Sequence, residues 1–254
     1  VPGQGLRAGS GGGMIAMDEM TENEAAAKLP RTPVLITAAT KWEAVPLAKA
    51  LGLDENGDGT WKGKIAGREI TLIKTGIGAA RTEERLSRGE AARNFGAVLS
   101  AGLCGAMQPE LKTGDLVIDP YEVEVDYVHP LRDVAKSLDV PFHFGKILHT
   151  NIVLQPDAKR KLGAEHRVSA CDMETAAVRR WAQGQSAVIA VRAVLDEMHE
   201  TCPADAPEGE DAASIAMFAL THAAQMPALI KTGYRSGRAM KNLGKFLKAY
   251  LENA

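Results

Sequence analysis

The residues with the clearest chemical potential are carboxylates that flank a predicted buried strand. Asp172, Met173 and Glu174 precede an alanine-rich segment with helical spacing, and Asp196 directly follows the apolar run 186–195. A valine-rich run of this length predicts a strand buried on both faces. Open α/β sheets bind ligands outside the carboxyl ends of their strands, so we expect Asp196 at a binding edge. The alternative is that Asp196 caps a turn and Glu174 is a solvated acid in the first turn of a helix.

The hydrophobic pattern around these carboxylates predicts alternating strands and helices. We expect strands at 34–37, 60–66, 69–75, 97–101, 114–118 and 186–195, and helices at 41–51, from about 79 to 95, and from Glu174 to a stop at Gly184. The second and third of these strands form a hairpin. Alternation at this spacing favours an α/β fold with a mostly parallel sheet covered by helices.

Two glycine-rich segments follow predicted strands. Gly76 and Gly78 follow the hairpin, and Gly102 and Gly105 lie in a segment, 102–106, that we expect to be a loop. Glycines after a strand allow backbone amides to approach an anion. The alternative is a tight turn without a ligand. The third glycine of a dinucleotide-binding fingerprint is missing, and no phosphate-binding P-loop is present.

Composition narrows the function class. The chain has 254 residues, with 30 basic and 32 acidic residues and a net charge of −2, which gives no electrostatic argument for nucleic-acid binding. Its three cysteines are far apart and odd in number, which disfavours a disulfide framework and favours a reducing cytoplasm. The six histidines show no ligand spacing, so we expect no metal site.

Both ends of the sequence differ from the middle. Residues 1–30 are rich in glycine, then in alanine and acids, and we expect a flexible lead or a segment added upstream of the native chain. We expect one domain over 31–254, with a basic amphipathic helical extension from about 212 to 254. This extension has two alternative interpretations: it docks on the domain or on a partner subunit, or it makes peripheral contact with a membrane surface.

Four motifs, taken in order, resemble the nucleoside phosphorylase and nucleosidase superfamily. They are Ala39-Thr40-Lys41-Trp42-Glu43, then Thr75-Gly76-Ile77-Gly78, then Ser100-Ala101-Gly102-Leu103-Cys104-Gly105 with Lys112-Thr113-Gly114-Asp115-Leu116-Val117, and last Asp172-Met173-Glu174-Thr175-Ala176-Ala177 with Arg192-Ala193-Val194-Leu195-Asp196. The resemblance spans roughly residues 33 to 200. It implies a three-layer α/β/α sandwich around a mixed, partly barrel-like sheet, and cleavage of the bond between a ribosyl group and a base.

The resemblance also implies roles by position. Asp196 matches the acid that protonates the leaving base, and Glu43 the carboxylate that activates water in the nucleosidase branch. Met173 and Glu174 match the residues that hold the ribosyl hydroxyls. Carboxylates suit an oxocarbenium-like transition state, because its sugar carries positive charge.

Further pocket residues follow from the same resemblance. We expect Gly76, Gly78, Gly102 and Gly105 to shape the pocket with their backbone amides. Leu103 stands where many members carry a serine or threonine that helps to hold phosphate or water. Val153 lies in the aliphatic segment 151–154, where members usually stack on a purine. No cofactor is implied.

The expected activity is hydrolysis of a ribonucleoside, with a purine as the expected base. A phosphorylase that uses phosphate as co-substrate, held by backbone amides and by Arg81 or Arg192, is the first alternative. A non-catalytic nucleoside-binding module is the second. The segment Gln225-Met226-Pro227-Ala228-Leu229 and the basic tail resemble the hopanoid-associated branch, which implies a lipid-linked nucleoside such as adenosylhopane. The family also implies a homo-oligomer.

Overall fold

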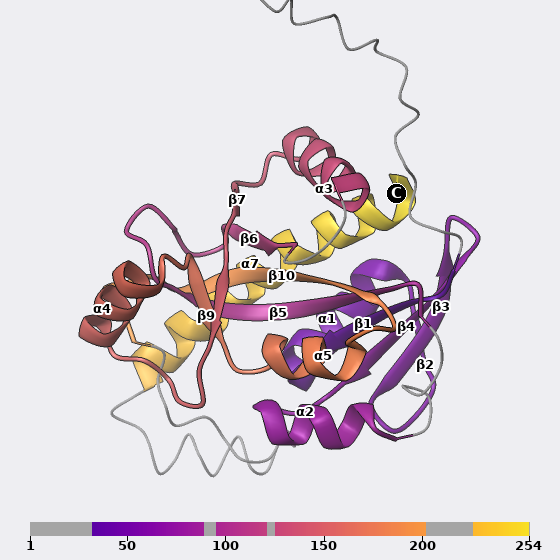
Figure 1. Ribbon diagram of the computed structural model, residues 1–254, viewed down its shortest axis with the longest axis horizontal. Coiled ribbons are helices and arrows are strands. Elements are labelled where there is room, and N and C mark those ends of the chain that lie inside the picture. The colour runs from indigo at the N-terminus through magenta and orange to yellow at the C-terminus, as the bar shows by residue number, and fades with distance from the viewer. Residues whose placement is uncertain (1–31, 89–94, 121–124, 202–225, 254) are drawn as a thin grey trace, which may run out of the picture.

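The computed structural model describes residues 32–88, 95–120, 125–201 and 226–253 (Figure 1). The strands described are β1 (Val34–Ala38), β2 (Asp54–Glu55), β3 (Thr60–Ile65), β4 (Arg68–Lys74), β5 (Ala97–Ala106), β6 (Leu116–Asp119), β7 (Phe142–Phe144), β8 (Ile147–His149), β9 (Ala170–Asp172) and β10 (Ala187–Asp196). The helices described are α1 (Lys41–Leu51), α2 (Ala79–Leu86), α3 (Val125–Ser137), α4 (Pro156–His166), α5 (Thr175–Ala182) and α7 (Met226–Asn253). The predicted lead, 1–30, and the part of the predicted extension at 212–225 lie outside these residues.

The strands form one mixed sheet in the order β2-β3-β4-β1-β5-β10-β6-β7, and β9 joins β8 to β5. β1 runs parallel to β4 and β5, and β5 runs parallel to β10. The carboxyl ends of these four strands therefore meet at one edge of the sheet. The predicted hairpin is confirmed, because β3 and β4 are antiparallel neighbours.

The expected loop at 102–106 is wrong, because β5 continues as a strand to Ala106. Its second half pairs with β10 on one side, where Gly102 lies opposite Arg192 and Leu103 opposite Ala193. On the other side Gly105 pairs with Cys171 of β9. These long-range pairings satisfy the backbone groups that a glycine-rich loop would have exposed to water.

Helices cover both faces of the sheet, as the predicted α/β fold requires. One hydrophobic cluster joins α1, α3 and α7 to the sheet through Leu47, Leu131 and Leu243. A second joins α2 and α5 to the other face through Leu86 and Val178. Figure 1 shows α2 and α5 on the near side of the sheet and α7 crossing behind it.

The C-terminal helix α7 is docked on the domain, as the first interpretation of the basic tail predicted. Seven apolar residues in its C-terminal half are fully or almost fully buried: Ala239, Met240, Leu243, Phe246, Leu247, Tyr250 and Leu251. They pack in the same cluster as α1 and the central strands. Lys241, Lys245 and Lys248 remain exposed on the opposite face. The apolar side of residues 239–251 thus faces the core, and any membrane contact would have to use the basic side.

Docking of α7 predicts a large cost for Phe246→Ala. The Phe246 side chain is completely buried and its ring stacks on that of Tyr250 at 6.2 Å between centroids. Removing it should lower the free energy of unfolding by about 3–5 kcal/mol. Urea unfolding followed by circular dichroism measures this. Lys245→Ala, one position earlier on the exposed face, is the matched control and should change it by less than about 0.5 kcal/mol. Equal effects would show that α7 is not docked in solution.

Candidate active site

Glu43 is held by the start of the first helix. Thr40 caps α1, its side chain accepts from the Glu43 amide, and Glu43 Oε2 accepts in return from the Thr40 amide at 2.8 Å. This reciprocal capping box turns the Glu43 side chain back toward the helix start. Its Oε1 accepts from the Leu103 amide of β5 at 2.8 Å. With 4% of its surface exposed, Glu43 is a buried carboxylate fixed between a helix start and a strand.

Arg192 is a buried guanidinium on β10, and it lies among carboxylates. Its Nη2 is 2.7 Å from Asp172 Oδ2 and donates to Ser100 Oγ at 2.9 Å and Thr175 Oγ1 at 3.1 Å. Its Nη1 is 3.7 Å from Glu174 Oε2. Removing one partner of a buried ion pair leaves an uncompensated charge, so these groups depend on one another.

Glu174 lies at the N-cap position of α5 and points toward the loop after β4. Its Oε1 accepts from the Gly78 amide at 2.9 Å. Burial raises the pKa of Glu174 to about 7, and the charges of Glu43 and Asp172 add to this, while Arg192 and the Gly78 amide oppose it. Glu174 therefore changes its charge near neutral pH.

Gly102 lies between Glu43 and Arg192. A Cβ on Gly102 would be 2.5 Å from Glu43 Oε1 and 2.6 Å from Arg192 Nη1, so both atoms face the same point above β5. Among the described residues, Arg192 Nη1 is buried without a hydrogen-bond partner. We call Glu43, Asp172, Glu174 and Arg192 the carboxylate–arginine cluster.

Asp196 lies at the end of β10, as predicted, and 8% of its surface is exposed. The ammonium of Lys159, on α4, contacts its Oδ2 in an ion pair. Burial raises the pKa of Asp196, and Lys159 opposes that rise. In register, Arg192 lies opposite Gly102 and Asp196 opposite Gly105. Gly102 and Gly105 are three residues apart on β5, a rise of about 10 Å along the strand, which is the scale of a nucleoside.

The structure brings together most of the predicted site residues. Glu43, Leu103, Gly102, Glu174 and Gly78 are linked by the contacts above. A Cβ on Gly105 would lie 3.2 Å from Asp196 Oδ2, so Gly105 borders the second centre.

At two of the expected glycine positions the backbone amide has a hydrogen-bond partner within the protein. The Gly76 amide donates to the Ala39 carbonyl at 2.9 Å, and the Gly78 amide donates to Glu174. Both glycines have positive φ angles, 89° and 87°, so they shape the turn rather than offer donors to an anion.

Met173 and Val153 are predicted site residues for which we describe position and exposure only. Met173 is half-buried between Asp172 and Glu174. Val153 is 38% exposed in the segment after β8, which begins where the Thr150 amide donates to the Asp172 carbonyl at 2.8 Å. Their contacts with a substrate stay predictions.

The sequence analysis did not predict the structural roles of two residues at the site. Arg192 was weighed only as a phosphate-binding arginine, although a charged residue inside an apolar strand signals a buried partner. Lys159 stands in the basic stretch Lys159-Arg160-Lys161, which is typical of a solvated helix face, so the sequence carried no signal for its burial.

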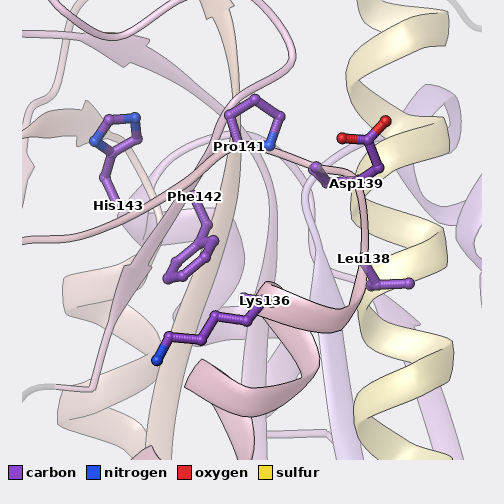
Figure 2. Close-up of a pocket in the computed structure, with 8 residues that line it drawn as sticks. Lys136, Leu138, Asp139, Pro141, Phe142 and His143 are labelled. Atoms are coloured by element: carbon purple, nitrogen blue, oxygen red, sulfur yellow. The ribbon is translucent and has the colours of Figure 1, made fainter.

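A surface depression of about 430 Å³ lies apart from these groups, at the connection between α3 and β7. Residues 135, 136 and 138–143 line it, and none of them is in the carboxylate–arginine cluster. Figure 2 shows His143 and Asp139 on opposite sides of Pro141, so its charged groups do not converge. We do not include it in the active site.

Among the described residues, no group of three His, Cys, Asp or Glu side chains is arranged to hold a metal ion. None of the described helices is both long and apolar enough to span a bilayer.

Comparisons with known proteins bear on the family and the fold. The family model of the phosphorylase superfamily matches residues 33–131. Comparison with curated protein sequences finds no match.

Solved structures are similar over most of the chain. Futalosine hydrolase of Helicobacter pylori is 18% identical with a TM-score of 0.67, covering 88% of this chain and 98% of that one. A 5′-methylthioadenosine/S-adenosylhomocysteine nucleosidase of Neisseria meningitidis, bound to methylthio-immucillin-A, is 17% identical with a TM-score of 0.65, covering 88% and 100%. The nucleosidase of the same name from H. pylori is 18% identical with a TM-score of 0.67, covering 88% and 99%. The resemblance to the nucleoside phosphorylase and nucleosidase superfamily is therefore confirmed, by the sequence match over residues 33–131 and by the shared fold.

Proposed function

We propose that this protein is a nucleosidase that hydrolyses the N-glycosidic bond of a ribonucleoside. The observation that carries the proposal is the carboxylate–arginine cluster, in which three carboxylates surround one buried guanidinium, with Asp196 about 10 Å away along the same strands. The negative charge of the carboxylates stabilises a sugar that becomes positively charged in the transition state. An acid at the other end assists departure of the base. The hydrolases among the solved structures support the same activity.

Water would be activated between Glu43 and Arg192. The two carboxylate oxygens of Glu43 have about four acceptor positions, and the Leu103 amide and the Thr40 amide and hydroxyl use three of them. The remaining position is on Oε1, beside Arg192 Nη1. A water molecule there accepts from Arg192 and donates to Glu43. Glu43 removes its proton as the oxygen attacks the anomeric carbon.

Glu174 would hold the ribosyl group. In its ionised form it accepts hydrogen bonds from sugar hydroxyls, and the Gly78 amide fixes one of its oxygens. Met173 lies beside it in the chain and provides apolar contact. The negative charge of Glu174 stabilises the oxocarbenium-like sugar as the bond to the base breaks.

Phosphate is disfavoured as the attacking group by charge. Arg192 is 1% exposed and is already paired with Asp172, and Glu43 and Glu174 adjoin it. A phosphate ion placed at this point would meet three carboxylates and one guanidinium. Arg81, the other arginine considered for phosphate, has an exposed side chain that packs against Gly76.

The proposed substrate class rests on the sequence resemblance and on exposed apolar side chains. We propose a purine ribonucleoside, with an apolar 5′ substituent of the lipid-linked kind that the sequence resemblance implies. Large apolar side chains are exposed on α1, on the loop before Gly78 and after β8: Trp42, Val45, Ile77, Ile152 and Val153. Such a surface suits an apolar group better than water. The homo-oligomer and the membrane contact through the basic side of α7 remain part of this proposal.

The first prediction is base release without phosphate. Adenosine, inosine, methylthioadenosine and adenosylhopane in detergent are offered with and without phosphate, and free base is measured by chromatography. We expect turnover without phosphate, and Glu43→Gln should lower kcat by about 10²–10⁴-fold, as loss of a general base does.

Glu69→Gln, an exposed position on β4, is the matched control and should leave kcat unchanged. Turnover only with phosphate would make the protein a phosphorylase. Tight binding of a nucleoside without any turnover would make it a binding module.

The second prediction is a rising pH dependence set by Glu174. Since its pKa is about 7, kcat/KM should increase as the pH rises through about 7 and the carboxylate forms. In Glu174→Gln this rising limb should be absent and kcat lower. A wild-type profile that is flat between pH 5.5 and 8.5 would contradict the role of Glu174.

The same group should affect stability in the opposite direction. The unfolded chain ionises Glu174 near its ordinary pKa of 4.5 and the folded chain near 7, so folded-state stability falls as pH rises through this window. The free energy of unfolding of Glu174→Gln relative to wild type should therefore grow by about 3 kcal/mol between pH 4.5 and 8. Urea unfolding at both pH values measures it.

The third prediction concerns close approach at Gly102. Because a Cβ there would overlap Glu43 and Arg192, Gly102→Ala should displace one of them and lower kcat by about 10²-fold or more. Gly237→Ala, on α7 with no atom within 4 Å of its added Cβ, is the control and should keep full activity. Unchanged activity of Gly102→Ala would show that the point between Glu43 and Arg192 is not used.

A further inference from the structure

Lys159 is a buried lysine that the proposed reaction does not use. Only 1% of its surface is exposed. Its ammonium contacts Asp196 Oδ2 and donates to the carbonyls of Glu197 at 3.1 Å and Glu200 at 2.8 Å. An ammonium has three N–H donors, so all three have an acceptor in the protein. Lysine is almost never fully buried unless it is paired, so the burial of Lys159 depends on these three acceptors.

The partners of Lys159 are themselves fixed. α4 lies close against the backbone of Met107, since a Cβ on Gly163 would be 2.5 Å from the Met107 carbonyl oxygen. The Glu200 carboxylate is bound by Arg235 of α7 at 2.5 Å and lies 3.5 Å from Lys231. The Arg235 hydrogen bond lowers the pKa of Glu200 to about 2, so this tie persists at any working pH. The groups that surround the Lys159 ammonium are therefore held in place by further contacts.

The geometry divides the Asp196 carboxyl group into two sides. Lys159 contacts Oδ2, and in the proposed reaction Oδ1 is the oxygen that carries the proton for the leaving base. Because Lys159 has no N–H left to donate, it does not contact the substrate and acts through Asp196. When Asp196 gives up its proton it becomes a buried carboxylate, and the adjacent ammonium balances that new charge where the effective dielectric constant is low.

We propose that Lys159 is a positioning residue for departure of the base, which orients Asp196 and stabilises the carboxylate that Asp196 becomes. This rests on the proposed nucleosidase function. As the C–N bond breaks, its electron pair goes to the base, and the proton on Asp196 Oδ1 passes to a base nitrogen. Lys159 keeps all three of its protons throughout. The oxygen of the new anomeric hydroxyl group comes from water, and one proton of that water goes to Glu43.

Other charged and titratable groups interact electrostatically with Asp196. They are Cys104 on β5, Cys171 on β9, Glu200 after β10 and Arg235 on α7. Burial holds both thiols neutral by raising their pKa values, to about 12 for Cys171, and Glu200 is paired with Arg235. Lys159 is thus the cation in direct contact with Asp196. Its removal should raise the pKa of Asp196 and leave its carboxylate without a balancing charge.

The activity test compares two leaving groups in phosphate-free buffer. Methylthioadenosine needs a proton on its leaving base, whereas 4-nitrophenyl β-ribofuranoside releases a phenolate that is stable without one. Lys159→Met should lower kcat about 10²-fold or more on the nucleoside, as loss of acid catalysis does, with little change on the nitrophenyl riboside. Lys159→Arg, which keeps the charge, should recover part of the loss. Equal losses on both substrates would mean a merely structural role and overturn the proposal.

A double-mutant cycle distinguishes a catalytic effect from misfolding. This control is needed because Lys159→Met leaves Asp196 buried without its partner. Asp196→Asn removes the acid, and Lys159→Met combined with Asp196→Asn removes both charges. If Lys159 acts through Asp196, adding Lys159→Met to Asp196→Asn should cost no further activity on methylthioadenosine. A full additional loss would overturn the proposal.

A titration separates this inference from the proposed function. The carboxyl band of Asp196, identified by infrared difference against Asp196→Asn, is followed with pH in wild type and in Lys159→Met. We expect its midpoint to move to higher pH in the variant. If neither riboside is hydrolysed by wild type, the proposed function fails while this shift still establishes control of Asp196 by Lys159. An unchanged midpoint overturns the inference even if the enzyme is active.

Discussion

The buried charge of Arg192 is the interaction on which the rest of the site depends. A guanidinium with 1% exposure must be balanced, and Asp172 at 2.7 Å and Glu174 at 3.7 Å supply the charge. Asp172 also accepts from the Thr175 amide at the start of α5, so the balancing acid is part of a helix start. Breaking this network would leave buried charges unpaired, at a cost of several kcal/mol. The orientation of Glu174, and with it the sugar site, follows from the need to keep Arg192 paired.

Strand register then sets the distance between the two chemical centres. β5 and β10 run side by side, with Gly102 opposite Arg192 and Gly105 opposite Asp196. The two glycines on β5 leave room for side chains that reach over the strand from α1, α4 and β10. The site is therefore built on the central pair of the sheet rather than on loops, and rigid elements hold functional groups more accurately than loops do.

The C-terminal helix links the periphery of the fold to this centre. Its apolar face completes one layer of the domain against α1. Its polar face reaches back through Arg235 to Glu200, whose carbonyl accepts from Lys159. A helix that appears in the sequence as a separate basic extension is thus both part of the core and a support for Asp196.

Local pattern alone determined much of this protein. It predicted the strands that end near Glu43, Gly76 and Asp196, the helices that begin after Thr40 and near Glu174, and the edge where these residues meet, because periodicity and capping are short-range properties. It failed where partners are distant in the chain. Residues 102–106 form a strand because β10 and β9 supply hydrogen bonds. Arg192 is an internal counter-ion because Asp172 lies beside it, and Lys159 is buried because α4 places it against Asp196. Only the tertiary structure decided these points, since the charge balance of a buried group depends on residues that no local pattern specifies.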